Sequence, residues 1–357
     1  MEAAQYKSNQ YVRFCPGCGD HAILASLTKA MAQIGVPTHQ TVVISGIGCS
    51  SRMPHYLNTY GFNTIHGRGG AIATGVKTSH PELTVWQMTG DGDCLAIGGN
   101  HFIHEIRRNV DLNICLFNNR IYGLTKGQYS PTSPKGFVSK SSPFGTVERP
   151  FIPAELVMGA RGTFFARTLD VDMPTTVDCM VQAHQHKGAS VIECLVNCVI
   201  FNNGTHSWIA DRDTRAERSI ILKHGEKMIF GANKDKGLKL DYSTVIPHIV
   251  VTTADDPDVL VHDAKTEDPT LHRMLAMMGQ ERFTVDGGAS EHSDKGTMHD
   301  GASEHSDKEL PVALGVIRDV EAETYNEAVN KQINEVQGNA KVQTFDALTK
   351  TLEHWEM

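Results

Sequence analysis

The stretch TGDGDCLAIGGNHFIHEIRRNVDLNICLFNN, residues 89–119, holds a strand end, a helix and a second strand in direct succession. The apolar runs LTVWQMT (83–89) and LNICLFNN (112–119) predict two buried strands. Between them, residues 95–109 carry apolar side chains at helical spacing. A strand, a helix and a second strand of this length form a right-handed crossover, so the two strands should lie parallel in one sheet.

The same alternation continues on both sides of this unit. Apolar patterning predicts further helices at 21–35, 68–79 and 175–188, and further strands at 41–48, 163–170 and 190–197. Repeated strand and helix patterns predict an α/β fold, in which a parallel sheet is covered by helices on both faces. In such sheets ligands collect at the carboxyl ends of the strands.

The pattern weakens beyond about residue 205. One more helix is expected within 212–230, a strand at 312–320 and a terminal helix at 346–357. The rest is polar and predicts irregular structure. We therefore predict a cofactor-binding domain at 1–235 and an irregular C-terminal extension at 236–357 that contacts a partner.

The octapeptide GASEHSDK occurs twice in this extension, at 288–295 and 301–308. Two copies are too few for a solenoid. The composition of the octapeptide is that of a solvated loop, so we interpret the repeat as a local duplication.

Composition narrows the class of protein. The chain of 357 residues is 40% hydrophobic and 21% charged, an ordinary globular balance. Its net charge of -8 argues against nucleic-acid binding. The polar N-terminus and the lack of an apolar run near the length of a membrane span predict a cytoplasmic protein that does not enter membranes. Its eight cysteines are then expected to be ligands or core residues rather than disulfides.

Two strand-end motifs suit a magnesium diphosphate. Gly90-Asp91-Gly92-Asp93 ends one predicted strand, and Asn118-Asn119 ends the next. Mg²⁺ prefers hard oxygen ligands, which Asp91, Asn119 and a backbone carbonyl just beyond could supply beside phosphate oxygens. The glycines let the backbone approach the phosphates, and a helix starting near Leu95 would direct N–H groups at them. The competing interpretation is two ordinary turns.

Four cysteines suit a metal centre. Cys15 and Cys18 form a CxxC before a helix, Cys49 follows a predicted strand, and Cys198 follows the last strand of the sheet. Four thiolates bind a [4Fe–4S] cluster or a structural Zn²⁺, and spacing alone leaves both open. Cys194 is the main rival to Cys198, although it lies inside the strand pattern. The other three, Cys94, Cys115 and Cys179, fall in helix or strand patterns typical of buried side chains.

The ordered segments CPGCGDH, SGIGCSSRMPHY, HGRGGAIATG, TGDGD and FNNRIYGLTKGQYSPT resemble the β subunits of 2-oxoacid:ferredoxin oxidoreductases, most of all those for 2-oxoglutarate. The resemblance covers about residues 10–235 and implies the thiamine-diphosphate-binding (pyrophosphate-domain) fold. It favours a [4Fe–4S] cluster over zinc. The implied cluster ligands are Cys15, Cys18, Cys49 and Cys198. The implied Mg²⁺ ligands are Asp91, Asn119 and the carbonyl of Ile121. The implied cofactor-binding residues are Cys49, Ser50, Gly67, Arg68, Gly90, Asp91, Gly92, Asp93, Asn119, Ile121, Gly123 and Leu124.

The resemblance also implies an activity and partners. The reaction would be oxidative decarboxylation of a 2-oxoacid on thiamine diphosphate, or the reverse carboxylation, with coenzyme A taking the acyl group and ferredoxin the electrons. An α subunit, or a fused γα subunit, would bring the other half of the cofactor site. Arg52 and His66 are expected to face the substrate, and Arg52 favours the second carboxylate of 2-oxoglutarate. The sequence departs from the family pattern at Gly69-Gly70, where HGRA is usual.

Alternatives remain at this point. The substrate could be pyruvate or a broad range of 2-oxoacids. Less favoured are a cluster-free thiamine-dependent decarboxylase that holds zinc and a non-enzymatic electron-transfer or scaffold subunit.

Overall fold

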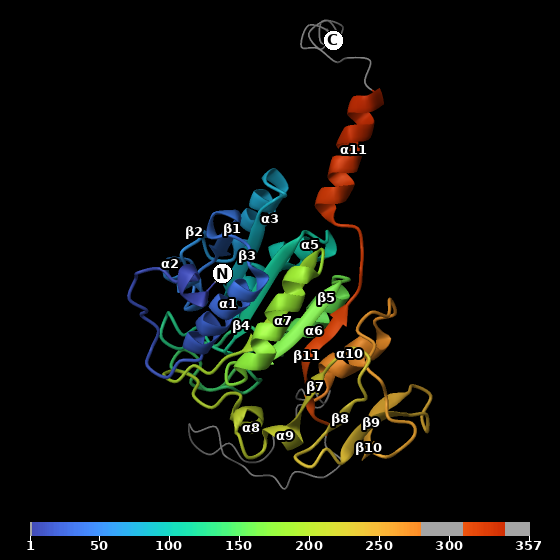
Figure 1. Ribbon diagram of the computed structural model, residues 1–357. Coiled ribbons are helices and arrows are strands. Elements are labelled where there is room, and N and C mark those ends of the chain that lie inside the picture. The colour runs from blue at the N-terminus through green and yellow to red at the C-terminus, as the bar shows by residue number, and fades with distance from the viewer. Residues whose placement is uncertain (1, 280–309, 340–357) are drawn as a thin grey trace, which may run out of the picture.

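The computed structural model describes residues 2–279 and 310–339, and an eight-stranded sheet in the order β2-β1-β3-β4-β6-β5-β11-β7 forms its core (Figure 1). The strands are β1 (Thr41–Ser45), β2 (Tyr60–Asn63), β3 (Thr84–Gly90), β4 (Leu112–Asn118), β5 (Phe164–Leu169), β6 (Ala189–Leu195), β7 (Ser219–Leu222) and β11 (Val312–Asp319). Neighbouring strands are parallel except that β11 runs antiparallel to β5. The predicted α/β fold is therefore confirmed, with two strands, β11 and β7, running opposite to the other six.

Helices cover both faces of the sheet. On one face α1 (Asp20–Ile34) packs against α7 (Met173–Gln185). The other face carries α3 (Gly69–Ser79), α5 (Gly99–Arg107), α6 (Pro153–Gly159) and α10 (Thr270–Met277). Alternate residues of each central strand supply the two cores, because successive side chains point to opposite faces. In β4, Cys115 and Phe117 join the α1 side, whereas Ile114 and Leu116 join the α3 side.

Shorter elements complete the chain. The short helical segments are η1 (Ala3–Tyr6), η2 (Thr38–Gln40), η3 (Ser50–Arg52), α2 (Met53–Tyr56), α4 (Asp91–Leu95), α8 (Ser207–Ala210) and α9 (Arg215–Arg218). Strands β8 (Ile229–Phe230), β9 (Lys236–Asp241) and β10 (His248–Thr253) form a separate antiparallel sheet. The last described helix, α11 (Tyr325–Asn339), extends away from the body of the molecule (Figure 1).

Two predicted helices differ from the structure. The helix expected at 95–109 is α5 and begins only at Gly99, because Leu95 ends the short helix α4 and the chain then turns and packs Gly98 against α4. A Cβ on Gly98 would lie 2.5 Å from the carbonyl oxygen of Asp93. The helix expected within 212–230 is only the short α9, because the chain then forms β7, which pairs with β11 from much later in the chain.

The predicted C-terminal extension contributes to the main sheet. No regular element was expected between 236 and 311, yet this region contains β9, β10 and α10. The predicted strand at 312–320 is β11, which lies between β5 and β7. The division at residue 235 stays a prediction. The duplicated octapeptide and the expected terminal helix lie outside the described residues. Within the described ranges, no helix combines the length and apolar character needed to cross a bilayer.

Candidate functional site

A cavity of about 460 Å³ lies at the carboxyl ends of β1, β3 and β4, where both strand-end motifs converge. Its lining residues are Asp20, Ile47, Gly48, Cys49, Ser50, His66, Gly90, Asp91, Gly92, Asp93, Phe117, Asn119, Ile121, Tyr122, Gly123, Leu124, Thr125 and Gln128. Most of the predicted cofactor residues are in this set. Gly67, Arg68 and Arg52 are outside it.

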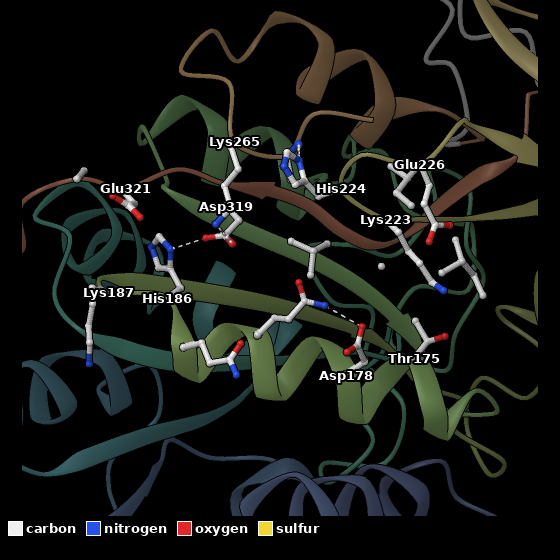
Figure 2. A pocket seen from close by; sticks show the side chains of 18 of the residues that line it. Thr175, Asp178, His186, Lys187, Lys223, His224, Glu226, Lys265, Asp319 and Glu321 are labelled. Atoms are coloured by element: carbon white, nitrogen blue, oxygen red, sulfur yellow. Dashed lines mark hydrogen bonds and ion pairs between the residues drawn. The ribbon is translucent and has the colours of Figure 1, made fainter. Parts of the chain in front are cut away.

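A larger cavity of about 1360 Å³ lies elsewhere, between α7, β7 and β11 (Figure 2). Three of its charged side chains, His186, Asp319 and Lys265, pair with one another. His186 Nδ1 lies 2.8 Å from Asp319 Oδ1, and Lys265 binds the other oxygen of that carboxylate. None of the predicted site residues lines this cavity. The smaller cavity is therefore the candidate site.

Asp91 is the first residue of α4, and its buried carboxylate lies beneath two hydroxyl groups. Ser130 and Thr132 both donate hydrogen bonds to its Oδ2 atom. Burial raises the pKa of Asp91 to about 6, although these hydrogen bonds oppose the rise. A divalent cation in the cavity would favour the charged carboxylate and offset this cost. Asp91 therefore fits a ligand for a hard cation.

Gly92 lets the β4 loop pack directly onto α4. A Cβ at this position would lie 2.2 Å from Cε1 of Tyr122. The Tyr122 hydroxyl donates a 2.9 Å hydrogen bond to the carbonyl oxygen of Gly92. The glycine between the two aspartates is thus required by packing as well as by any approach of a ligand.

Asp93 ties the loops around the cavity together. Its carboxylate accepts hydrogen bonds from the N–H groups of Ile47 (3.0 Å) and Gly67 (2.7 Å). It also accepts one from the Thr89 hydroxyl (2.7 Å) and lies 3.0 Å from Nδ1 of His66. Asp93 therefore has a structural function. Its predicted contact with the cofactor, and the predicted contact of His66 with substrate, stay predictions.

The two asparagines after β4 differ in their surroundings. Asn118 is buried, and its Nδ2 donates a 2.8 Å hydrogen bond to Glu193. Asn119 lines the cavity, and its Oδ1 accepts a 3.1 Å hydrogen bond from the N–H of Ile121. An amide oxygen has a second lone pair, so this contact leaves Asn119 able to bind a cation. The position of Asn119 and Ile121 on the cavity wall supports their predicted function.

Cys49 and Cys198 meet at Gly123. A Cβ on Gly123 would lie 3.5 Å from Sγ of Cys49 and 3.4 Å from Sγ of Cys198. Burial raises the pKa of Cys49 to about 12, and the nearby thiols of Cys198 and Cys15 add to the rise. Cys15 and Cys18 belong to one tight turn, in which the Cys18 N–H donates to the Cys15 carbonyl at 3.0 Å. Burial is also the largest cause that raises the pKa of Cys18, and nearby groups that include Cys198 and Cys49 add to the rise. The CxxC turn therefore lies near Cys49 and Cys198.

Cys194 has a different environment. It lies within β6, opposite Phe117 of β4 and Thr168 of β5, and is fully buried in the core beneath α1 and α7. Cys198 follows the end of the strand and faces Gly123 beside Cys49. This arrangement supports Cys198 rather than Cys194 as the fourth ligand. The other expected core cysteines, Cys94, Cys115 and Cys179, are buried.

The spacing of the thiols bears on whether they could bind a zinc ion or a [4Fe–4S] cluster. Among residues 2–279 and 310–339, no three His, Cys, Asp or Glu side chains are close enough to hold one metal ion. A zinc site needs four ligands at about 2 Å from a single ion. A [4Fe–4S] cluster binds each thiolate through a different iron, so its ligands stand further apart. The cluster stays a prediction.

Sequence patterns did not single out Asp20, Ser130 or Thr132. Burial, together with the carboxylate of Asp170, raises the pKa of Asp20 to about 7. Asp20 lines the cavity directly after the CxxC turn. Ser130 and Thr132 lie 39 and 41 residues beyond Asp91, and no local pattern shows that their loop returns to it. The run SPTS after NN, with three hydroxyl residues, was the one available signal.

Apart from the cysteines, three predicted site residues lie outside the cavity lining and have other contacts. Arg52 ends η3 and is half-buried, close enough to Cys49 for its charge to lower that thiol's pKa against the larger effect of burial. The Arg68 guanidinium donates a 3.3 Å hydrogen bond to the carbonyl of Ile97. Gly67 donates its N–H to Asp93, as described above. Their predicted contacts with cofactor and substrate stay predictions.

The departure from the family pattern at Gly69-Gly70 has a steric reason. A Cβ on Gly70 would lie 2.2 Å from Oε2 of Glu105, which is buried in α5. A Cβ on Gly69 would lie 3.1 Å from the backbone nitrogen of Gly46. Both glycines therefore allow the start of α3 to pack closely beneath the cavity.

Comparisons with known proteins show the family of this chain. The family model for the C-terminal TPP-binding domain of thiamine pyrophosphate enzymes matches residues 35–194, which include both strand-end motifs. The chain is 42% identical over 340 residues to the 2-oxoglutarate oxidoreductase subunit KorB of Mycobacterium tuberculosis, covering 93% of this chain and 82% of that protein. It is 45% identical over 211 residues to the 2-oxoglutarate synthase subunit KorB of Archaeoglobus fulgidus, covering 59% of this chain and 74% of that protein.

A solved structure shows the same fold. It is the 2-oxoglutarate:ferredoxin oxidoreductase from Magnetococcus marinus with 2-oxoglutarate, coenzyme A and succinyl-CoA bound. The TM-score is 0.72 at 27% identity, and the match covers 100% of this chain and 97% of the other. The chain therefore belongs to the family of 2-oxoacid:ferredoxin oxidoreductase β subunits and is one subunit of such an enzyme complex.

Proposed function

We propose that this chain is the β subunit of a coenzyme A-dependent enzyme that oxidatively decarboxylates 2-oxoglutarate and passes the electrons through a [4Fe–4S] cluster to ferredoxin, or catalyses the reverse reaction. One observation carries the proposal. The cavity that brings Asp91, Asn119 and Ile121 together shares a wall with the thiols of Cys49 and Cys198. The names of the similar proteins support 2-oxoglutarate as the substrate.

The residues of the cavity fit magnesium thiamine diphosphate. The Asp91 carboxylate, the Asn119 amide oxygen and the Ile121 carbonyl would hold Mg²⁺. Thiamine diphosphate, when bound, stabilises the carbanion that decarboxylation of a 2-oxoacid leaves behind. The protein's own contribution is to orient that group and exclude water. Phe117, Ile121 and Leu124 supply apolar wall for this purpose.

The cavity and the proposed cluster site share Cys49, which lines the cavity, and meet at Gly123. Gly123 lines the cavity and lies against both sulfur atoms. Because glycine has no side chain, it leaves room for the cluster and keeps the separation short. Cys15 and Cys18 would complete the ligand set from the turn before α1. Such an arrangement suits electron transfer out of the cavity.

The chain supplies half of the cofactor site, which makes activity depend on a partner. The carboxylates that line the cavity are Asp20, Asp91 and Asp93, and glutamate is absent from this lining. Thiamine enzymes need a glutamate at the aminopyrimidine ring, so an α subunit would bring it. We expect the isolated chain, purified without oxygen, to show the visible absorption of an Fe–S cluster but no 2-oxoglutarate-dependent reduction of ferredoxin. Adding the α subunit should restore turnover.

Two results would contradict this proposal. One is turnover by the isolated chain at a rate comparable to that of the complex. The other is a colourless chain that contains zinc in place of iron, which would remove the electron-transfer function.

The choice of 2-oxoglutarate rests on Arg52 within this chain. A guanidinium paired with the distal carboxylate would form charge-assisted hydrogen bonds in a shielded cavity. Losing this contact should cost a few kcal/mol, or about 10²-fold in kcat/KM. We therefore expect Arg52→Met to lower kcat/KM for 2-oxoglutarate by about 10²-fold in the complex and to leave pyruvate turnover unchanged.

Arg68→Met is the matched control, because it removes the same charge from a residue that binds a backbone carbonyl. It should change turnover of both substrates to the same extent. Equal losses for both substrates in Arg52→Met would show that Arg52 acts on Cys49 or on the fold, and would favour pyruvate or a broader range of 2-oxoacids.

A further inference from the structure

Two buried hydroxyl groups hold the Asp91 carboxylate by hydrogen bonds to one of its oxygen atoms. Ser130 is 2% exposed and Thr132 3% exposed, and both donate to the same oxygen, Oδ2. Two donors on one oxygen fix the rotation of the carboxylate about its Cβ–Cγ bond. They also occupy the lone pairs of that oxygen, so a cation could bind the group through the other oxygen.

These hydroxyl groups are themselves held in place. The N–H of Ser130 donates to Ser133 Oγ at 2.8 Å, and the Ser133 hydroxyl donates to the carbonyl oxygen of Arg120 at 2.6 Å. Thr132 Oγ1 lies 3.0 Å from Oδ1 of Asn118. The segment 130–133 therefore connects the Asp91 end of β3 to the asparagine end of β4.

The connection continues through the sheet. Asn118 donates to Glu193 at 2.8 Å, and Glu193 accepts a 2.7 Å hydrogen bond from Nε of the fully buried Arg167. Arg167 in turn donates to the carbonyl of Ala276 in α10 at 3.1 Å. Nη2 of Arg167 is the one atom of this group that has no hydrogen-bond partner among the described residues. The single proton of the Thr132 hydroxyl goes to Asp91, so Thr132 lies beside this network at Asn118 without donating to it.

We propose that Ser130 and Thr132 are positioning residues that hold Asp91 for one-oxygen binding of Mg²⁺ and thereby select Mg²⁺ over Ca²⁺. Mg²⁺ requires a near-ideal octahedron, whereas Ca²⁺ accepts six to eight ligands and two-oxygen carboxylates. A carboxylate that has one oxygen engaged by hydrogen bonds can offer only its other oxygen, which suits Mg²⁺. A carboxylate that is free to rotate can offer both oxygens, which suits Ca²⁺. This inference rests on the proposed function, because it concerns the same magnesium diphosphate site.

A merely structural function of these hydroxyls is the alternative. Thr146 provides the matched control, since it is a buried threonine of the same loop. Its hydroxyl donates to the carbonyl of Pro134 at 2.7 Å and accepts from the N–H of Phe137 at 3.2 Å. Thr146→Val therefore removes another buried loop hydroxyl, and neither of these two contacts is with Asp91.

The experiment measures Mg²⁺ and Ca²⁺ dissociation constants by titration calorimetry, using the complex of this chain with its α subunit, freed of metal and saturated with thiamine diphosphate. Thr132→Val and Ser130→Ala should each weaken Mg²⁺ binding by about 10–100-fold, the usual loss when a residue that orients a ligand is removed. Ca²⁺ binding should weaken less, so the preference for Mg²⁺ falls. Thr132→Ser should restore the wild-type preference.

Thr146→Val should lower the melting temperature without changing the ratio of the Mg²⁺ dissociation constant to the Ca²⁺ dissociation constant. The inference is overturned if Ser130→Ala and Thr132→Val keep the wild-type ratio, or if Thr146→Val shifts the ratio equally. Should Thr132→Val fail to fold, Ser130→Ala still decides the question. Failure of the wild-type complex to bind Mg²⁺ with thiamine diphosphate would contradict the proposed function itself, and is distinguishable from failure of the variants to differ.

Discussion

Cys198→Ser should empty the cluster site, so that iron falls from about four atoms per chain to a small fraction of that value and the visible absorption is lost. Serine is a weak substitute for a thiolate on iron, and Cys198 is the thiol that shares the Gly123 contact with Cys49. Ferredoxin reduction by the complex should fall to background, because no other route for electrons leads out of the cavity in this proposal. Iron analysis and anaerobic spectra of the purified chain measure the effect.

Cys194→Ser is the matched control for this prediction. Its thiol is fully buried within β6, so serine would place a hydroxyl in the apolar core and cost about 1–3 kcal/mol of folding free energy. The melting temperature should fall, but iron content should stay at the wild-type value. Iron lost in Cys194→Ser and kept in Cys198→Ser would show that the fourth ligand is Cys194.

Asp91→Asn should abolish retention of thiamine diphosphate by the complex. The substitution removes the one carboxylate assigned to Mg²⁺, and the loss should exceed the 10–100-fold that accompanies removal of a residue that only orients a ligand. The fold should survive. Burial raises the pKa of Asp91, so its charged form is disfavoured in the folded state and a neutral amide relieves that cost. Cofactor content after desalting in Mg²⁺ buffer gives the measurement.

Asp93→Asn tests whether the two aspartates of the motif have different functions. Asp93 accepts hydrogen bonds from the loops at Ile47 and Gly67, so its variant should lower the melting temperature of the apoprotein more than Asp91→Asn does. Undiminished cofactor content in Asp91→Asn would remove the basis for the diphosphate site. A melting temperature that falls more in Asp91→Asn than in Asp93→Asn would reverse the functions assigned to these residues.

The sequence by itself determined the part of the fold that depends on local pattern. Strands β3 and β4, the crossover between them and the positions of Asp91 and Asn119 all follow from apolar periodicity and strand-end residues within a short window. The preference for Cys198 over Cys194 came from the same source, because a residue inside a strand run faces the core or the neighbouring strands. The family, confirmed by comparison, was also recognisable from the order of its motifs.

Only the tertiary structure decided features that depend on contacts between distant segments. The insertion of β11 beside β5 and the strand character of β7 arise from pairing across the chain, which overrides local preference. The hydroxyls of Ser130 and Thr132 reach Asp91 because a loop folds back over the strand ends, and a loop's path leaves no periodic trace in sequence. Only the structure shows that the side chain of Asp93, two residues beyond Asp91, accepts hydrogen bonds from the backbone of two other loops.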